Sequence, residues 1–219
     1  IIPTAPVKRN IALVSFVLGI LIPVVIIFIR ENMNTKVRGR KDLESLSLPF
    51  IGEIPLAASG KKKDETTKSI VITQGNRDII NEAFRVLRTN LEFMLDAKTE
   101  GKASVTLFTS FNPGSGKTFL TMNTAATFAL KSKRVLVIDG DLRHGSASAY
   151  LGLHYKGLSD YLGKRENKLN DLIQENPDCP GFFLLPAGTI PPNPTELLAE
   201  PLFKETIEQL RGHYDYIFI

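Results

Sequence analysis

Short apolar runs alternate with segments of mixed polarity over the second half of the chain. The run 135–138 reads Val-Leu-Val-Ile and predicts a strand that is buried on both faces of a parallel sheet. Another run contains Val105, Leu107 and Phe108, which we also expect to be buried. Because helical patterns separate the runs, the sequence predicts an α/β fold with a parallel sheet and flanking helices. The predicted strands are 104–108, 135–138, 182–185 and 214–219.

Helical periodicity is clearest over residues 77–96, where apolar side chains including Phe84 and Leu91 recur at helical spacing. We expect this amphipathic helix to pack its apolar face on the domain. Further helices are predicted over 121–130, over 157–163 and from Thr195, as its cap, to about Arg211.

The N-terminal region has one long apolar segment. Residues 11–29 carry no charge over about 19 residues, the length of a helix that crosses a bilayer. A signal peptide would end in small residues, whereas charged and polar residues 30–32 follow here, and a buried core helix rarely lacks a polar face. We therefore expect a transmembrane helix over 10–30, kinked at Pro23.

Basic residues are more frequent after this segment than before it, where only Lys8 and Arg9 stand. The more basic side of a span faces the cytoplasm, so we expect the α/β domain to be cytoplasmic. The expected organisation is 1–9 outside the cytoplasm, 10–30 in the membrane, 31–75 a linker and 76–219 the domain. The basic residues after the span are Arg30, Lys36, Arg38, Arg40 and Lys41.

The amino-acid composition argues against several kinds of function and site. The formal net charge is +4, and basic residues are not interleaved with aromatic ones, so we expect no nucleic-acid partner. The single cysteine, Cys179, excludes an internal disulfide and a cysteine-based zinc site. The three histidines are far apart in sequence, and no metal cluster is expected from them.

The loop after the first predicted strand has the chemistry of a phosphate-binding loop. Gly114 and Gly116 allow a close approach of the backbone, Lys117 would reach the β- and γ-phosphates, and the Thr118 hydroxyl would coordinate magnesium. The match to G-x-x-x-x-G-K-[ST] is imperfect, because Phe111 stands at the first glycine, but the strand–loop–helix context supports it. The expected nucleotide-binding residues are Asn112, Pro113, Gly114, Ser115, Gly116, Lys117, Thr118, Phe119 and Arg143.

Two carboxylates, Asp139 and Asp141, directly follow the strand at 135–138. Ligands of open α/β sheets bind at the carboxyl ends of strands, and βαβ units place consecutive strand ends together. We therefore expect both carboxylates beside the phosphate loop, where with Thr118 they would hold magnesium. A solvated Asp-Gly-Asp turn is the alternative.

Glu82, Arg85 and Arg88 recur every three residues along the helix 77–96, on the side opposite its apolar face. Their spacing alone favours a solvated face with ion pairs inside the helix. A charged surface that meets a neighbouring subunit is the alternative.

Together these motifs resemble the bacterial protein tyrosine kinases of capsule and exopolysaccharide assembly, the BY-kinases. Residues 108–118 resemble their Walker A motif, which also lacks the leading glycine, and 137–143 resemble their Walker A′ motif D-x-D-x-R. Residues 82–88 resemble their E-x-x-R-x-x-R oligomerisation motif, and residues 193–198 and 50–55 resemble further family segments. The residues before the span resemble the end of a chain-length-determinant domain.

The resemblance implies a P-loop NTPase-like fold and an autokinase that transfers the γ-phosphoryl group of MgATP to tyrosine. It implies that Lys117, Asp139 and Asp141 are catalytic, with Asp139 taking the tyrosine proton, although the division of roles between the two aspartates stays open. Glu82, Arg85 and Arg88 would assemble a homo-oligomeric ring. The protein would lie in the bacterial inner membrane and act with the polysaccharide polymerisation and export machinery.

The family pattern also places a Walker B aspartate directly after Ile219 and a tyrosine-rich tail beyond it, so we expect a piece of a longer protein with impaired activity. One alternative is an ATPase switch of the MinD/ParA type, although those usually carry an extra lysine where this chain has Phe111. Another is a non-catalytic polysaccharide co-polymerase scaffold.

Overall fold

The computed structural model describes residues 8–33, 39, 43, 47–56, 70–96, 101–150, 156–166 and 168–219. The chain divides into two compact units, Ile1–Phe50 and Ile51–Ile219. The predicted extracytoplasmic residues 1–7 and the four basic residues between 36 and 41 lie outside the described residues. Residues 51–56 and 70–75, which the sequence assigns to a linker, belong to the second unit.

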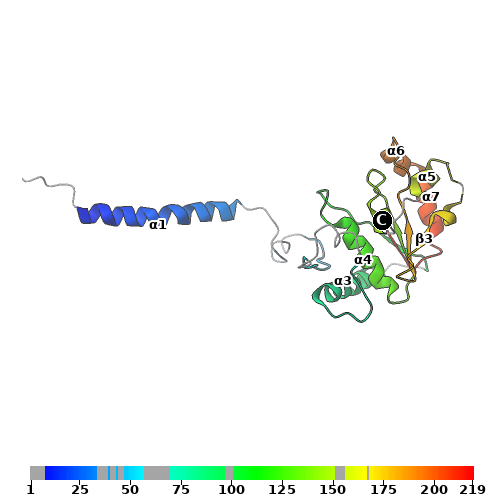
Figure 1. Ribbon diagram of the computed structural model, residues 1–219, viewed down its shortest axis with the longest axis horizontal. Coiled ribbons are helices and arrows are strands. Elements are labelled where there is room, and N and C mark those ends of the chain that lie inside the picture. The colour runs from blue at the N-terminus through cyan, green and yellow to red at the C-terminus, as the bar shows by residue number, and fades with distance from the viewer. Residues whose placement is uncertain are drawn as a thin grey trace, which may run out of the picture. The chain divides into compact units, whose positions relative to one another are not determined.

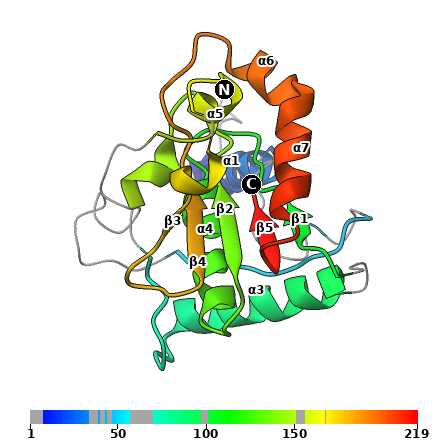
Figure 2. The same ribbon diagram turned by 90° about the vertical axis from the view of Figure 1, so that its right-hand side faces the viewer.

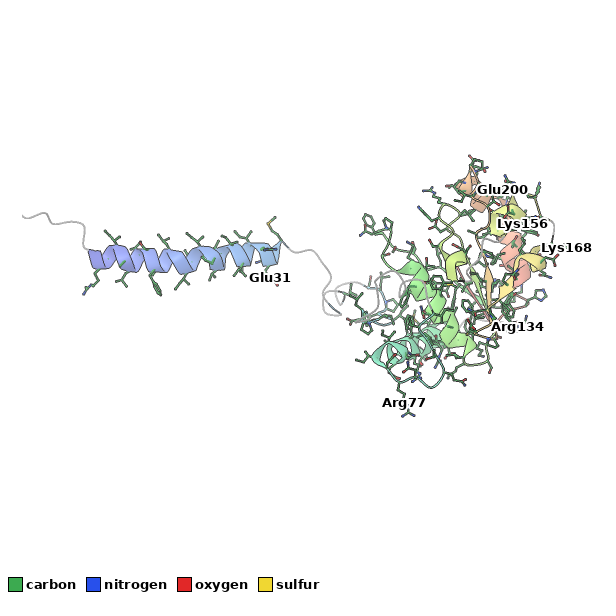
Figure 3. All side chains as sticks on the ribbon, viewed as in Figure 1. Glu31, Arg77, Arg134, Lys156, Lys168 and Glu200 are labelled. Atoms are coloured by element: carbon green, nitrogen blue, oxygen red, sulfur yellow. The ribbon has the colours of Figure 1, made fainter. Side chains whose placement is uncertain are left out.

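The first unit contains the helix α1 (Lys8–Asn32), which continues through Pro23 without a break (Figure 1). Its segment Arg9–Asn32 has a mean hydropathy of 3.1, and none of that segment is buried within the protein. Apolar side chains extend from all sides of the helix (Figure 3). Length and composition thus make α1 a candidate membrane span, in agreement with the expectation for residues 10–30.

The second unit is built on a five-stranded sheet in the order β1-β5-β2-β4-β3. All neighbours are parallel except β3, which pairs antiparallel with β4. The expected parallel α/β sheet is confirmed, with one antiparallel edge strand that the sequence did not reveal. The strands are β1 (Ser104–Thr106), β2 (Val135–Ile138), β3 (Gln174–Glu175), β4 (Phe182–Leu185) and β5 (Tyr216–Phe218).

Helices cover both faces of the sheet (Figure 2). Alternate residues of β2 supply the two cores, because successive side chains of a strand point to opposite faces. Val135 and Val137 join a cluster with α3 and α4, whereas Leu136 and Ile138 join a cluster with α5, α6 and α7. The helices are α3 (Ile79–Asp96), α4 (Lys117–Ala129), α5 (Leu158–Leu162), α6 (Pro194–Ala199) and α7 (Pro201–Leu210), with short 3₁₀ turns η2 (Ser146–Tyr150) and η3 (Leu169–Leu172).

The expected burial of the first strand is wrong for two of its residues. Val105 is 38% exposed and Leu107 is 69% exposed, because β1 lies at the edge of the sheet and has β5 as its neighbour. Phe108 does pack inward, with its ring centroid 5.5 Å from that of Phe218.

The predicted helix from Thr195 to about Arg211 is two helices. Glu200 has an extended backbone (φ −68°, ψ 145°) between α6 and α7, because a proline disfavours helical geometry in the residue before it and Pro201 follows. Thr195 is not the cap, because Asn193 occupies the N-cap position of α6 and Pro194 begins the helix.

Candidate active site

The predicted phosphate loop follows β1 and leads into α4. Gly114 (φ 73°) and Gly116 (φ 91°) both have the left-handed backbone that glycine adopts without strain. No heavy atom lies within 4 Å of the position of a Cβ on either glycine, so this part of the backbone is open to a ligand. The loop holds its own shape, since Ser115 Oγ donates to Ser110 Oγ and Ser110 Oγ donates to the carbonyl of Asn112, 2.9 Å away.

The first turn of α4 carries Lys117, Thr118 and Phe119, all partly buried. Gly116 is the N-cap residue and supplies no side-chain hydrogen bond, so the amide groups of this turn have no capping side chain. Free amides and the positive end of the helix dipole favour an anion at this place. The loop therefore has the geometry for binding phosphate.

Asp139 organises the loop that follows β2. Its Oδ1 accepts from the N–H of Asp141 at 3.1 Å, and its Oδ2 accepts from the N–H of Ala147 at 2.9 Å. The residue is only 7% exposed. Burial raises the pKa of the Asp139 carboxyl to about 6, and the charge of Asp141 also raises it, although the two hydrogen bonds act in the opposite direction. A carboxyl with such a pKa can exchange a proton near neutral pH.

Asp141 is exposed and forms a tight turn of its own. Its Oδ1 accepts from the N–H groups of Arg143 and His144, each at 3.3 Å, and lies 3.2 Å from His144 Nδ1. Arg143 reaches across to α6, where its Nη2 lies 3.4 Å from Thr195 Oγ1. His144, Ser110 and Thr195 were not predicted as site residues. For Thr195 the only sequence signal was the family-like segment around it.

The phosphate loop and the two carboxylates both follow the C-terminal ends of their strands, β1 and β2. We expected these two strand ends to lie side by side, but β1 and β2 are not neighbours in the sheet. β5 lies between β1 and β2, which separates the two strands by about 10 Å. Ile219 continues β5 and bridges the gap, since the Phe108 N–H donates to the Ile219 carbonyl at 2.8 Å and a Cβ on Gly140 would lie 3.2 Å from Ile219 Cγ2. Asp139 and Asp141 therefore lie across the end of β5 from the strand that leads into the phosphate loop.

The donor set fits magnesium. Among the described residues no three His, Cys, Asp or Glu side chains gather into a metal cluster. Magnesium is usually held by one or two carboxylates, waters and substrate phosphates, so it needs no such cluster. Asp139, Asp141 and Thr118 supply oxygen donors of this kind, and their joint binding of magnesium stays a prediction.

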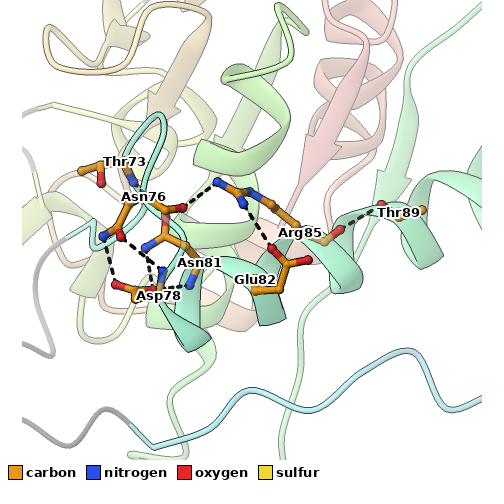
Figure 4. A network of polar contacts seen from close by, with 7 residues as sticks. All are labelled: Thr73, Asn76, Asp78, Asn81, Glu82, Arg85 and Thr89. Carbon is orange, nitrogen blue, oxygen red and sulfur yellow. Dashed lines mark hydrogen bonds and ion pairs between the residues drawn. The ribbon is translucent and has the colours of Figure 1, made fainter.

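The predicted oligomerisation residues divide into two groups. Glu82 is exposed and Arg85 is partly buried, with 61% and 35% of their side chains accessible, and the two form a 3.1 Å ion pair (Figure 4). Arg85 Nη2 also donates to the carbonyl of Asn76 at 2.6 Å, beside Asp78, which caps α3 by accepting from the Asn81 N–H (Figure 4). The prediction that Arg88 shares this exposed side is wrong. Arg88 is 9% exposed, and its side chain lies between α3 and α4.

The chain is similar to bacterial tyrosine kinases. It is 33% identical over 232 residues to the putative tyrosine-protein kinase AmsA of Erwinia amylovora, which covers 99% of this chain and 31% of AmsA. It is 34% identical to the BceF tyrosine kinase domain, with a TM-score of 0.70 over 82% of this chain and 73% of that domain. The kinase domain of Escherichia coli Etk gives 31% identity and a TM-score of 0.71, over 84% of this chain and 72% of that domain. No protein-family model matches the chain.

The chain spans about a third of the length of the curated relatives it matches. Its similarity to the solved kinase domains confirms the P-loop NTPase-like fold with flanking helices. At this level of identity and coverage, the chain belongs to the family of bacterial tyrosine kinases.

Proposed function

We propose that this chain is the kinase portion of a protein tyrosine autokinase that transfers the γ-phosphoryl group of ATP, with Mg²⁺, to a tyrosine hydroxyl. The observation that carries the proposal is the phosphate loop at the uncapped start of α4. This loop and the buried Asp139 both follow the C-terminal ends of parallel strands. Membership of the tyrosine kinase family agrees with it.

Lys117 and the amides of residues 114–118 would bind the phosphate oxygens and offset the charge that develops on the transferred group. Mg²⁺, held by Thr118 and Asp141 together with the phosphates, would neutralise further charge. Asp139, with a pKa raised to about 6, is the base that would accept the proton of a phenol whose own pKa is near 10. The tyrosine oxygen then bonds to the γ-phosphorus, the bond from that phosphorus to the bridging oxygen breaks, and ADP leaves.

We also propose the cellular setting that the family resemblance implies. The domain would lie on the cytoplasmic side of the bacterial inner membrane, with α1 as its anchor. It would assemble into a ring with copies of itself and regulate the polymerisation and export of capsular or exopolysaccharide. The exposed ion pair of Glu82 and Arg85 on α3 is available for such assembly.

The test is the substitution Lys117→Met in the longer protein that contains this chain, incubated with γ-labelled ATP. We expect loss of labelled phosphotyrosine, because the charge beside the β- and γ-phosphates is removed. Lys131→Met is the matched control: it removes an equal charge from an exposed position just beyond the other end of α4. Wild-type labelling in the Lys117 variant would refute the proposal. Label released only as free phosphate would indicate an ATPase switch, and a nucleotide-dependent oligomer without phosphotyrosine would indicate a scaffold.

A further inference from the structure

Arg88 is a buried cation with its partners inside the same subunit. It lies on α3, and its Nη1 donates to the carbonyl of Thr127 on α4 at 3.1 Å. Its Nε lies 3.8 Å from Glu92 Oε2, one helical turn further along α3, and this carboxylate is itself only 20% exposed. Buried charges persist where they are paired and hydrogen-bonded. Within the subunit the Glu92 carboxylate supplies the opposite charge and the Thr127 carbonyl one hydrogen bond, whereas the Arg88 Nε atom itself has no hydrogen-bond partner among the described residues.

The Thr127 carbonyl is a group that α4 itself leaves unpaired. A helix has no intrahelical donors for its last four carbonyls, which in α4 belong to residues 126–129. Three of the four are taken by the backbone N–H groups of the next residues: Leu130 donates to Ala126, Lys131 to Phe128 and Ser132 to Ala129. The fourth, on Thr127, accepts from Arg88.

The charge of Arg88 also suits this position. The C-terminal end of a helix carries partial negative charge, and a cation there is stabilising. The contact joins residues 39 positions apart in sequence and ties α3 to the last turn of α4. Arg88 therefore completes the end of the helix that begins at Lys117.

From these contacts we infer that Arg88 is an internal brace that completes the C-terminal end of α4 and fixes α3 on it. Glu82 and Arg85 alone of the three motif residues then face a partner subunit. The inference rests on the assembly role proposed for this motif and refines it, because it assigns two of the motif's residues to the contact with a partner subunit and the third to the interior of the subunit. Its test does not measure phosphorylation. The kinase assignment can therefore fail while this inference stands, and this inference can fail while the kinase assignment stands.

The experiment compares Arg88→Ala with Arg85→Ala in the full chain in detergent micelles. Arg85 is the matched control, because it lies one turn earlier on the same helix and loses the same charge. Thermal unfolding is measured at a dilution where the wild type is monomeric, and self-association is measured by sedimentation at rising concentration. We expect R88A to lower Tm by about 4 °C or more at that dilution, whereas R85A changes Tm by less than about 2 °C and weakens self-association.

Hydrogen exchange and a conservative variant make the result specific. In R88A, exchange of the amides in the last turn of α4 should accelerate more than elsewhere in that helix. Arg88→Lys keeps a donor for the Thr127 carbonyl and should recover part of the lost Tm. A Tm of R88A equal to that of the wild type would overturn the inference, and so would a Tm of R88K as low as that of R88A. If R88A does not fold, R88K is compared with R85K, and equal Tm values for those two would overturn it.

Discussion

Replacing Asp139 with Asn tests whether burial keeps its carboxyl partly protonated in the folded protein. The pKa of this group rises from 3.8 to about 6 on folding, a difference of about 2.2 units. Each unit corresponds to 1.36 kcal/mol, so the ionised form in the folded protein costs about 3 kcal/mol. Because the folded-state pKa is the higher one, the contribution of this carboxyl to stability is fully present below pH 3.8 and lost as the pH rises through about 6.

The Asp139→Asn variant cannot ionise at this position. We therefore expect the free energy of unfolding of the variant, minus that of the wild type, to increase by about 2 kcal/mol between pH 4 and pH 7, because the unfolded carboxyl is already more than half ionised at pH 4. Asparagine keeps only one of the two oxygens, so either the Asp141 N–H or the Ala147 N–H loses its acceptor, but that loss is the same at every pH and cancels from the change. A difference that stays constant over this range would refute the reasoning.

Urea unfolding at a series of pH values gives the required free energies. The chain has no tryptophan and five tyrosines, all at or beyond position 150, so tyrosine fluorescence reports the α/β unit and not α1. The assay follows the full chain in detergent, without nucleotide or magnesium, because a bound cation would favour the ionised carboxylate.

Three further substitutions test the loop and the packing. Gly157→Ala should lower Tm by about 4 °C or more, because its Cβ would lie 2.0 Å from the carbonyl oxygen of Pro186; an unchanged melting curve would contradict this close approach. Gly116→Ala should weaken binding of a fluorescent ATP analogue, because its φ of 91° strains any residue with a Cβ by about 1–2 kcal/mol, and wild-type affinity would show that the loop can relax. Asn123→Leu removes the oxygen that accepts from the Val71 N–H at 2.8 Å, so exchange of that amide should accelerate by about tenfold or more; unaltered protection would show that another group holds it.

Two of the three central strands, β2 and β4, could be predicted to the residue because they are apolar throughout, whereas β5 (Tyr216–Phe218) is shorter than the predicted 214–219. The runs 135–138 and 182–185 coincide with β2 and β4, since a two-sided core demands an unbroken apolar sequence. β3 has only the polar pair Gln174–Glu175 and shows no such pattern. The same reasoning failed for Val105, because apolar composition does not distinguish a central strand from an edge strand.

The chemistry of the site was predictable from local motifs, but its spacing was not. Which strand would lie between β1 and β2 depends on long-range pairing that no local pattern encodes. The burial of Arg88 did leave a signal, since it follows Phe84 by four residues and precedes Leu91 by three, which places it on the apolar face of α3. Its partner, a backbone carbonyl of α4, has no sequence signature.

β3 is an edge strand that is poorly suited to pair with a further strand. Its two polar residues pair antiparallel with β4, and the Glu175 carboxylate then accepts from the N–H of Gly181 at 2.9 Å, which fastens the chain reversal beside it. A strand this short, bearing a charge, offers little to a foreign backbone. Any lateral extension of this sheet by a further strand must therefore be added on the side of β1.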